Sequence, residues 1–329
     1  MALPQAPSFN SGTDLVSKNA WRHGTVWHYT TATGLAGLIG RKVLWASATA
    51  FMNDLQELHT GKAVFDKLLE THAEQVDSCI QEEFNSMVRT ALRNDRHRTF
   101  IACASRLPDS LTMWRNYTSE VGFAVALDGT EPLFMRRQRQ ITDKMIAALG
   151  HKNEKNKQLV RALAATGSAP FEWTPAVYRP EEQYNAAWAA LRGIEATALA
   201  RAGDREPDKH EFEAMADAAK VLPTFKNPAF QDEAEMRIVC NAGMDVDLMY
   251  LKHRPGRYGM IPYVELGLPE DHMQKLGDEP EPMRDLPITG VVIGPTPYPE
   301  EARIGVLELL RSHGHENVLV VESRIPFRS

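Results

Sequence analysis

The stretch ITGVVIGP, residues 288–295, is followed by PEEARIGVLELLRSHG at 299–314 and by NVLVVES at 317–323, and this segment decides the class of fold. The first and third pieces are short runs rich in β-branched residues, which is typical of strands. The middle piece has apolar residues at helical spacing, and Gly314 supplies a common helix end. We therefore expect a strand–helix–strand unit over residues 288–323.

Further strand-like and helical runs precede this unit. Short helices are predicted at 33–40 and 110–118, and a longer helical stretch at 54–94, from apolar residues at a period near 3.6. Six apolar, β-rich runs predict strands: GTVWHYT (24–30), KVLWASAT (42–49), TFIACAS (99–105), VGFAVALD (121–128), EMRIVCN (235–241) and YGMIPYVELGL (258–268). Strands and helices in this irregular order predict an α+β fold with one mixed sheet.

The domain organisation follows from where the strands resume. Residues 131–220 are rich in Ala, Glu, Lys and Arg, and we interpret them as a helical insertion, a lid or partner surface, because strands return after them. Residues 1–22 are expected to be a polar lead-in without the basic start and apolar core of a signal peptide. We predict a single α+β domain at 23–329.

Composition sets the broad class of protein. The chain has 329 residues, a formal net charge of −6 and 43% hydrophobic residues, which is ordinary for a globular protein. No apolar run approaches the roughly 20 residues that span a bilayer. Cys79, Cys103 and Cys240 are odd in number and far apart, so a disulfide framework is not expected and a cytoplasmic location fits best. Local basic clusters occur at 93–98 and 135–140.

Common catalytic motifs are missing from the sequence. It holds no P-loop, no G-x-G-x-x-G after a strand, no G-x-S-x-G elbow and no H-E-x-x-H. His313 and His315 read as loop residues, and we predict no metal site. These absences disfavour P-loop, Rossmann, hydrolase and zinc-protease chemistry.

The stretch FQDEAEMRIVC, residues 230–240, carries the most suggestive charges. If it is one strand, Glu233, Glu235 and Arg237 share a face. One reading is a solvated strand face with a Glu–Arg pair. The other is a carboxylate pair that stabilises the developing cation of a sugar-transfer reaction, with Arg237 keeping a carboxylate ionised.

Three other groups of residues allow two readings each. Asn53-Asp54, with Glu57 three residues after the Asp, is a capping-box pattern or an anion or ribose contact. Trp114 and Tyr117, at helical spacing, are core aromatics or a platform for a planar ring. His28-Tyr29-Thr30, at the end of a strand, is structural or part of a site.

The landmarks together resemble the bacterial domain-of-unknown-function family 2971. The resemblance covers about residue 25 to the C-terminal end and weakens over the expected insertion. Its landmarks here are Trp27-His28-Tyr29-Thr30, Leu44-Trp45-Ala46-Ser47, Phe51-Met52-Asn53-Asp54 with Glu57, Cys103-Ala104-Ser105, Met113-Trp114-Arg115-Asn116-Tyr117 and Glu233-Ala234-Glu235-Met236-Arg237.

A weaker resemblance is to ADP-ribosyltransferases, in the order of a first-strand His, a middle-strand Ser and a late Glu-x-Glu. It implies a split, mixed β-sheet core that holds NAD and breaks the nicotinamide–ribose bond. Glu235 would bind the nicotinamide ribose and stabilise the cation, and Glu233 would position or deprotonate an unknown protein or nucleic-acid acceptor. The implied NAD-binding set is His28, Tyr29, Thr30, Ser47, Asn53, Ser105, Trp114, Tyr117 and Arg237.

The resemblance leaves a second function class open. The same cleft would also suit a non-catalytic module that binds a nucleotide or a nucleic-acid end through the basic clusters. Glu235 discriminates between them: an enzyme needs it in a concave site, and a scaffold leaves it solvated or paired with Arg237. A metal hydrolase would need a ligand cluster that the sequence does not offer.

Overall fold

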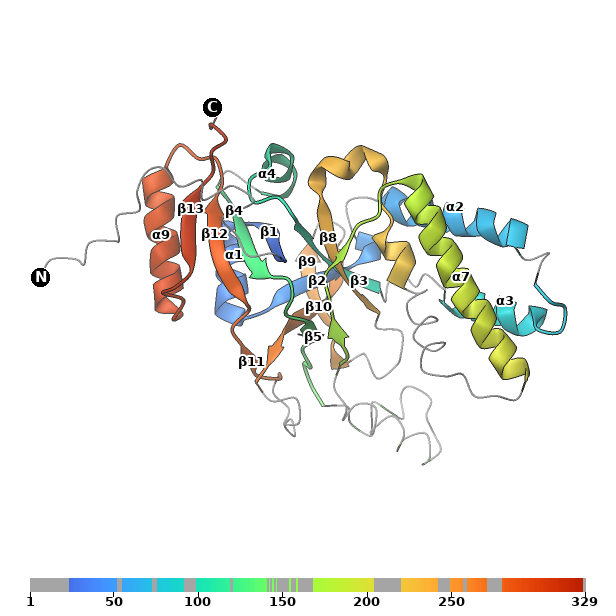
Figure 1. Ribbon diagram of the computed structural model, residues 1–329. Coiled ribbons are helices and arrows are strands. Elements are labelled where there is room, and N and C mark those ends of the chain that lie inside the picture. The colour runs from blue at the N-terminus through green and yellow to red at the C-terminus, as the bar shows by residue number, and fades with distance from the viewer. Residues whose placement is uncertain are drawn as a thin grey trace, which may run out of the picture. The chain divides into compact units, whose positions relative to one another are not determined.

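The computed structural model describes residues 24–327, apart from 52–54, 73–75, 92–98, 119–120, most of 141–167, 204–219, 242–248, 257–258 and 271–279. The expected lead-in at 1–22, Asn53-Asp54 and the basic cluster at 93–98 lie outside the described residues. The described chain is α+β with a mixed sheet, as predicted (Figure 1). Its contacts divide it into two compact units.

Unit 1 comprises the described residues of 1–40, 105–130 and 287–329. Its sheet has the strand order β13-β12-β4-β1, in which β12 and β13 are parallel and the other pairs antiparallel. The strands are β1 (Thr25–Thr31), β4 (Gly122–Asp128), β12 (Ile288–Ile293) and β13 (Leu319–Glu322). The helices are α1 (Ala32–Arg41), α4 (Leu111–Tyr117) and α9 (Pro299–Ser312).

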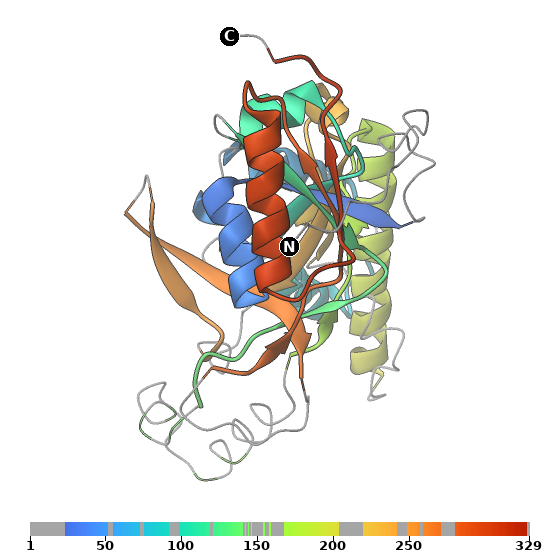
Figure 2. The same cartoon turned by 90° about the vertical axis from the view of Figure 1, so that its left-hand side faces the viewer.

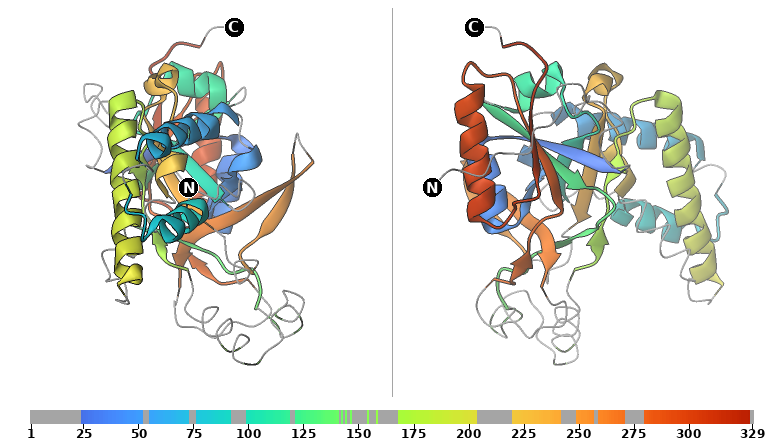
Figure 3. Two further views of the ribbon diagram at one scale, coloured as in Figure 1. Left: turned by 90° about the vertical axis from the view of Figure 1, so that its right-hand side faces the viewer. Right: turned by 60° about the vertical axis from the view of Figure 1, so that its left-hand side comes forward.

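The predicted strand–helix–strand unit is confirmed as β12–α9–β13. β12 and β13 pair in parallel from Gly290↔Leu319 to Ile293↔Glu322, and α9 packs beside them (Figure 3). α9 buries Val306 and Leu310. A parallel strand pair needs such a crossover helix, which is why the apolar period switches from strand to helix and back over this segment.

Unit 2 comprises the described residues of 41–104 and 131–286. Its sheet runs β3-β2-β10-β5-β6; β9 and β11 also pair with β10, and β8 pairs with β3 and β7. The main strands are β2 (Leu44–Ala48), β3 (Thr99–Ser105), β8 (Glu235–Asn241), β9 (Lys252–Gly256) and β10 (Gly259–Pro269). The shorter ones are β5 (Leu133–Met135), β6 (Pro170–Phe171), β7 (Thr174–Pro175) and β11 (Met283–Arg284).

Three helices form a second layer of unit 2. α2 (Leu55–His72) and α3 (Gln81–Ala91) both pack against α7 (Pro180–Ala202), as the left panel of Figure 3 shows. The predicted helical stretch at 54–94 is thus two helices, since residues 76–80 are not helical. The apolar core between them includes Phe65, Leu68, Phe84, Leu191, Ile194 and Phe225.

The region expected to be a helical insertion is helical only in part. α7 confirms the helical content, but β5, β6 and β7 also fall between residues 131 and 220 and join the sheet of unit 2. Two of these strands have only two residues, which is too few for a periodic pattern in the sequence to predict them. The 3-10 turns η2 (Leu222–Thr224) and η3 (Pro228–Glu233) then lead into β8.

Candidate functional site

The residues predicted from sequence are distributed over both units. His28, Tyr29, Thr30, Ser105, Trp114 and Tyr117 belong to unit 1, whereas Ser47, Glu233, Glu235 and Arg237 belong to unit 2.

In unit 1, Tyr29 and Trp114 lie together in the core. Their ring centroids are 4.6 Å apart in an edge-on arrangement, and Trp114 is 5% exposed. The Tyr29 hydroxyl donates to the Leu107 carbonyl (2.8 Å) and accepts from the Ser110 amide (3.1 Å). Burial raises the pKa of Tyr29. Both rings are therefore packed in the core, so for Trp114 the interpretation as a core aromatic holds.

Asp109 organises the polar partners of this aromatic pair, and sequence reasoning missed it. Its carboxylate accepts from the Trp114 indole (2.7 Å), the Ser323 hydroxyl (2.6 Å) and the Arg324 amide (2.8 Å). The only available signal was its position just before the predicted helix, where an acceptor side chain is common. Asp109 thus ties α4 to the segment after β13.

The other candidates of unit 1 differ in exposure. Ser105 is fully buried and its hydroxyl accepts from the Leu107 amide (3.0 Å). His28 and Thr30 are partly exposed on β1, on the face opposite Tyr29, and Tyr117 is 39% exposed. His28, Thr30 and Tyr117 thus retain exposed surface for a ligand.

In unit 2, the charges of FQDEAEMRIVC are arranged differently from the sequence prediction. β8 begins at Glu235, Glu233 ends η3, and Ala234 between them has φ 44° and ψ 47°. This left-handed conformation interrupts the strand alternation. The prediction of one strand face carrying all three charges is therefore wrong for Glu233, although Glu235 and Arg237 do share a face.

The carboxylates nevertheless meet, because Lys226 bridges them. The Lys226 ammonium lies 2.5 Å from a carboxylate oxygen of Glu233 and 2.5 Å from one of Glu235. These three side chains are 2–5% exposed. The interpretation as a solvated strand face is therefore wrong. Lys226 was not predicted from the sequence, where it is a single lysine in the segment TFKNP with no pattern around it.

Arg237 completes the buried network. Its guanidinium donates to Glu235 (2.8 Å) and to the Pro223 carbonyl (2.7 Å), and the side chain is 1% exposed. This confirms the predicted Glu–Arg pair. Two cations and two carboxylates then balance, which is the condition for burying such a group of charges.

The network fixes the protonation of Glu235. Burial by itself disfavours the charged carboxylate, but the Arg237 guanidinium and then the Lys226 ammonium outweigh it and lower the pKa of Glu235 from 4.5 to about 2. Burial, followed by the Glu235 carboxylate, raises the pKa of the Cys103 thiol well above its ordinary value. The protonated thiol hydrogen-bonds Glu235. Glu235 is thus ionised and held by three donors.

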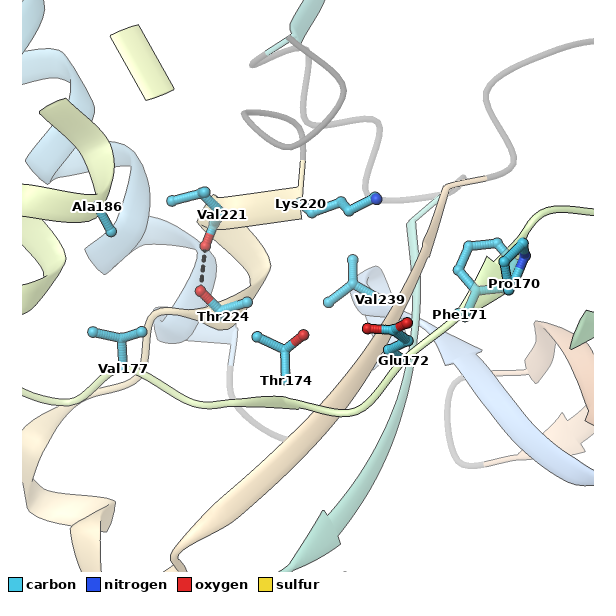
Figure 4. A pocket seen from close by; sticks show the side chains of 10 residues that line it. All are labelled: Pro170, Phe171, Glu172, Thr174, Val177, Ala186, Lys220, Val221, Thr224 and Val239. Atoms are coloured by element: carbon cyan, nitrogen blue, oxygen red, sulfur yellow. Dashed lines mark hydrogen bonds between the residues drawn. The ribbon is translucent and has the colours of Figure 1, made fainter. Parts of the chain in front are cut away.

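Figure 4 shows a pocket of about 560 Å³ whose lining includes residues of β7 and β8 next to this network. Val239, on the same face of β8 as Glu235 and Arg237, forms part of its wall. Thr174, paired with Arg237 across β7 and β8, forms another part. The complete lining is Pro170, Phe171, Glu172, Thr174, Val177, Ala186, Lys220, Val221, Thr224 and Val239.

The pocket combines apolar walls with a few polar groups. In Figure 4 the apolar Val177 and Ala186 lie at one end and the Phe171 ring at the other, with the Lys220 ammonium and the Glu172 carboxylate between Phe171 and the centre. Its volume falls within the roughly 300–1,000 Å³ typical of small-molecule sites. Neither Lys220 nor Glu172 belongs to any motif recognised in the sequence.

Ser47 and the basic stretch at 135–140 have partners elsewhere in unit 2. Ser47 accepts from the Arg254 guanidinium (3.1 Å). Arg136 and Arg137 pair with the buried carboxylates of Glu265 and Glu281. The guanidinium groups of this cluster are therefore committed within the fold.

Among the residues that the structure describes, no group of three or more His, Cys, Asp or Glu side chains is placed to hold a metal ion. None of the helices in the described ranges has the length and apolarity needed to cross a membrane. No family model, curated protein or solved structure matches the chain.

Proposed function

We propose that the chain binds a nucleotide in the pocket beside β7 and β8, with NAD the first ligand to test. The observation that carries the proposal is the lining of the pocket, where Lys220 and Glu172 stand among apolar walls. A lysine suits a phosphate group and a carboxylate suits ribose hydroxyls. Phe171 offers a ring surface for a base.

The wall hydroxyls support the same class of ligand. The Thr224 hydroxyl donates to the Val221 carbonyl (2.6 Å), so its oxygen can still accept a hydrogen bond from a ligand. Thr174 is exposed and can both donate and accept. A ligand with a planar apolar part, hydroxyls and an anionic part satisfies all of these groups.

Isothermal titration with NAD, ADP-ribose, AMP and adenosine tests this proposal. In Lys220→Met the affinity for the three phosphate-bearing ligands should fall about tenfold or more, the usual contribution of a charge-assisted hydrogen bond. Adenosine should bind wild type and variant alike. Lys67→Met, which removes an exposed lysine of α2, is the control of equal charge change. Equal affinities in Lys220→Met and Lys67→Met, or no binding of any nucleotide at millimolar concentration, would refute nucleotide binding in this pocket.

The second candidate function is cleavage of bound NAD, as an ADP-ribosyltransferase-like enzyme with a split-sheet core would perform it. It rests on the ionised state of Glu235, because a fixed carboxylate stabilises an oxocarbenium-like centre. The pairing of Glu235 with Arg237, and its absence from the pocket lining, is the arrangement expected of the binding module, which is why catalysis is the second candidate. In this reaction the bond from ribose C1′ to the nicotinamide nitrogen breaks and its electron pair leaves with nicotinamide. The acceptor nucleophile bonds to C1′ and releases a proton.

Glu235 and Glu233 would then have different roles. Glu235 is 5% exposed and already accepts from three donors, so it would act through its charge. Glu233 is 2% exposed and paired with Lys226, so we assign it to holding Lys226 in place. The contacts expected from His28, Tyr29, Thr30 and Tyr117 stay predictions.

Nicotinamide release from NAD, followed by chromatography with candidate protein, DNA and RNA acceptors, tests the catalytic step. We expect release by the wild type and none by Glu235→Gln, with NAD affinity and the circular dichroism spectrum retained. NAD binding without release in the wild type would refute catalysis and leave a nucleotide-binding module.

A further inference from the structure

One face of the β2–β10–β9 part of unit 2 carries aromatic and cationic side chains together. Residues directly opposite in an antiparallel pair share a face, and the pairs here are Trp45↔Glu265, Ser47↔Tyr263, Tyr263↔Lys252 and Ile261↔Arg254. Figure 2 shows β9 and β10 as a twisted two-stranded ribbon. We call this group of side chains the Trp45 face: Arg41, Trp45, Ser47, Lys252, Arg254 and, buried beneath them, Tyr263 and Glu265.

The cations of the Trp45 face are arranged over its rings. The guanidinium carbons of Arg41 and Arg254 lie 5.3 Å and 5.6 Å from the centre of the Trp45 ring. The Lys252 ammonium lies 6.0 Å from the centre of the Tyr263 ring, and Tyr263 is 4.8 Å from Trp45. Cation–π contacts of this kind fix the position of a cation without neutralising it.

The charges on this face do not balance, in contrast to those around Lys226. Glu265 is its one carboxylate among the described residues, and it is fully buried. It is shared between Lys252 (3.0 Å) and Arg136 (3.3 Å). The three cations of the Trp45 face, Arg41, Lys252 and Arg254, therefore outnumber its single carboxylate by two, and that carboxylate is also paired with Arg136.

The Arg254 guanidinium is held in place by a neutral partner. It donates to the Ser47 hydroxyl (3.1 Å), and its buried Nε–H has no hydrogen-bond partner in the described part of the chain. Arg41 is exposed, and the Lys252 side chain is 36% exposed. Arg41, Lys252 and Arg254 are therefore hydrogen-bond donors that keep exposed surface with which they can bind an anion.

We propose that the Trp45 face binds the phosphate backbone of a single-stranded nucleic acid. Guanidinium forks match phosphate geometry, and single strands are bound by cationic surfaces in which aromatic side chains meet the bases. Lys252 and Arg254, two residues apart on β9, lie about 6.6 Å from each other along the strand, so they can contact successive phosphates of an extended chain. Trp45 is partly exposed between the cations and offers the ring surface.

Fluorescence anisotropy of a labelled single-stranded 20-mer, as DNA and as RNA, over a salt series tests the proposal. Three phosphate contacts, from Arg41, Lys252 and Arg254, predict a slope of log affinity against log salt of about −2. Arg41→Gln and Arg254→Gln should each weaken binding about tenfold and reduce the slope by about 0.7. The control is Arg192→Gln, which removes a 61% exposed arginine of α7 and should change neither value.

Competitors decide the class of ligand. We expect a duplex of the same sequence to bind at least about tenfold more weakly than the single strand. Heparin and a poly-glutamate peptide should each bind the wild type and Arg254→Gln with equal affinity. Three results would each overturn the proposal. They are equal affinity for duplex and single strand, equal effects of Arg192→Gln and Arg254→Gln on binding, and a loss of poly-glutamate affinity in Arg254→Gln as large as the loss for the single strand. Lys220→Met should leave binding of the single strand unchanged, so this test is independent of the pocket.

Discussion

Replacement of Lys226 by Met tests the buried network of unit 2. Lys226 is 3% exposed and its ammonium holds two carboxylates at 2.5 Å. The variant leaves two buried carboxylates with Arg237 as the remaining cation. Loss of one partner of a buried ion pair costs about 3–5 kcal/mol, because the other charge stays buried without compensation. We expect Lys226→Met to lower the free energy of opening of β8 by that amount.

The pKa of Glu235 gives a second route to the magnitude. A carboxyl whose pKa falls from 4.5 to about 2 is stabilised in its charged form by about 3 kcal/mol at neutral pH, after the cost of burial has been offset. Arg237 supplies the larger part and Lys226 the next. Lys226→Met also removes the ammonium that lies 2.5 Å from the Glu233 carboxylate, so the variant affects both carboxylates.

Hydrogen exchange followed by mass spectrometry measures the opening of β8 directly, and it does not require the two units to unfold together. The double variant Lys226→Met/Glu233→Gln removes a carboxylate along with the cation. We expect it to be more stable than Lys226→Met alone by at least about 1 kcal/mol, the coupling of residues in one network. Lys67→Met should change opening by less than about 0.5 kcal/mol. A loss below 1 kcal/mol in Lys226→Met, or no recovery in the double variant, would refute a charged, mutually dependent network.

Two further predictions concern acid stability and close packing. Because the pKa of Glu235 is lower in the folded than in the unfolded state, its contribution to stability is fully present above about pH 4.5 and is lost as the pH falls toward 2. The urea midpoint of unfolding should therefore fall less steeply over this range in Glu235→Gln than in the wild type. Gly294→Ala should lower stability by about 1–3 kcal/mol in thermal unfolding, since an added Cβ would lie 2.9 Å from the Trp114 ring and 3.1 Å from the Gly122 carbonyl oxygen. Gly305→Ala, in α9 with no atom within 4 Å of the added Cβ, should raise stability by about 0.5–1 kcal/mol, and equal effects of the two glycine variants would contradict the packing explanation.

Most of the regular elements could be predicted from the sequence because their local patterns agree with their burial. The eight predicted strands are all present, as are the helices around 33–40, 110–118 and 299–314. β4 is an example, because GFAVALD is buried at all but its last position and its continuous apolar run predicts a buried strand. The two-residue strands β6 and β7 carry too few residues for such a signal, and they depend on their partners across the sheet.

The candidate site could be predicted only in part, because its contacts join distant segments. The pair of Glu235 with Arg237 follows from strand alternation, and it is confirmed. Lys226 is nine residues before Glu235, beyond any helical or strand period. The pocket takes its lining from residues 170–186 and from 220–239, which meet through the β7–β8 pairing. Tertiary pairing, not local pattern, determines these neighbours.

The left-handed conformation at Ala234 explains why Glu-Ala-Glu-Met-Arg differs from an ordinary strand face. A non-glycine residue in this region costs about 1–2 kcal/mol, so other interactions must hold it there. The turn at Ala234 lets Glu233 and Glu235 approach the same ammonium of Lys226 despite lying on either side of the strand start. With Arg237 the group is electrically neutral and can be buried. These charges are therefore engaged with one another, and a ligand has to be recognised by side chains that keep exposed surface, such as Glu172 and Lys220 of the pocket.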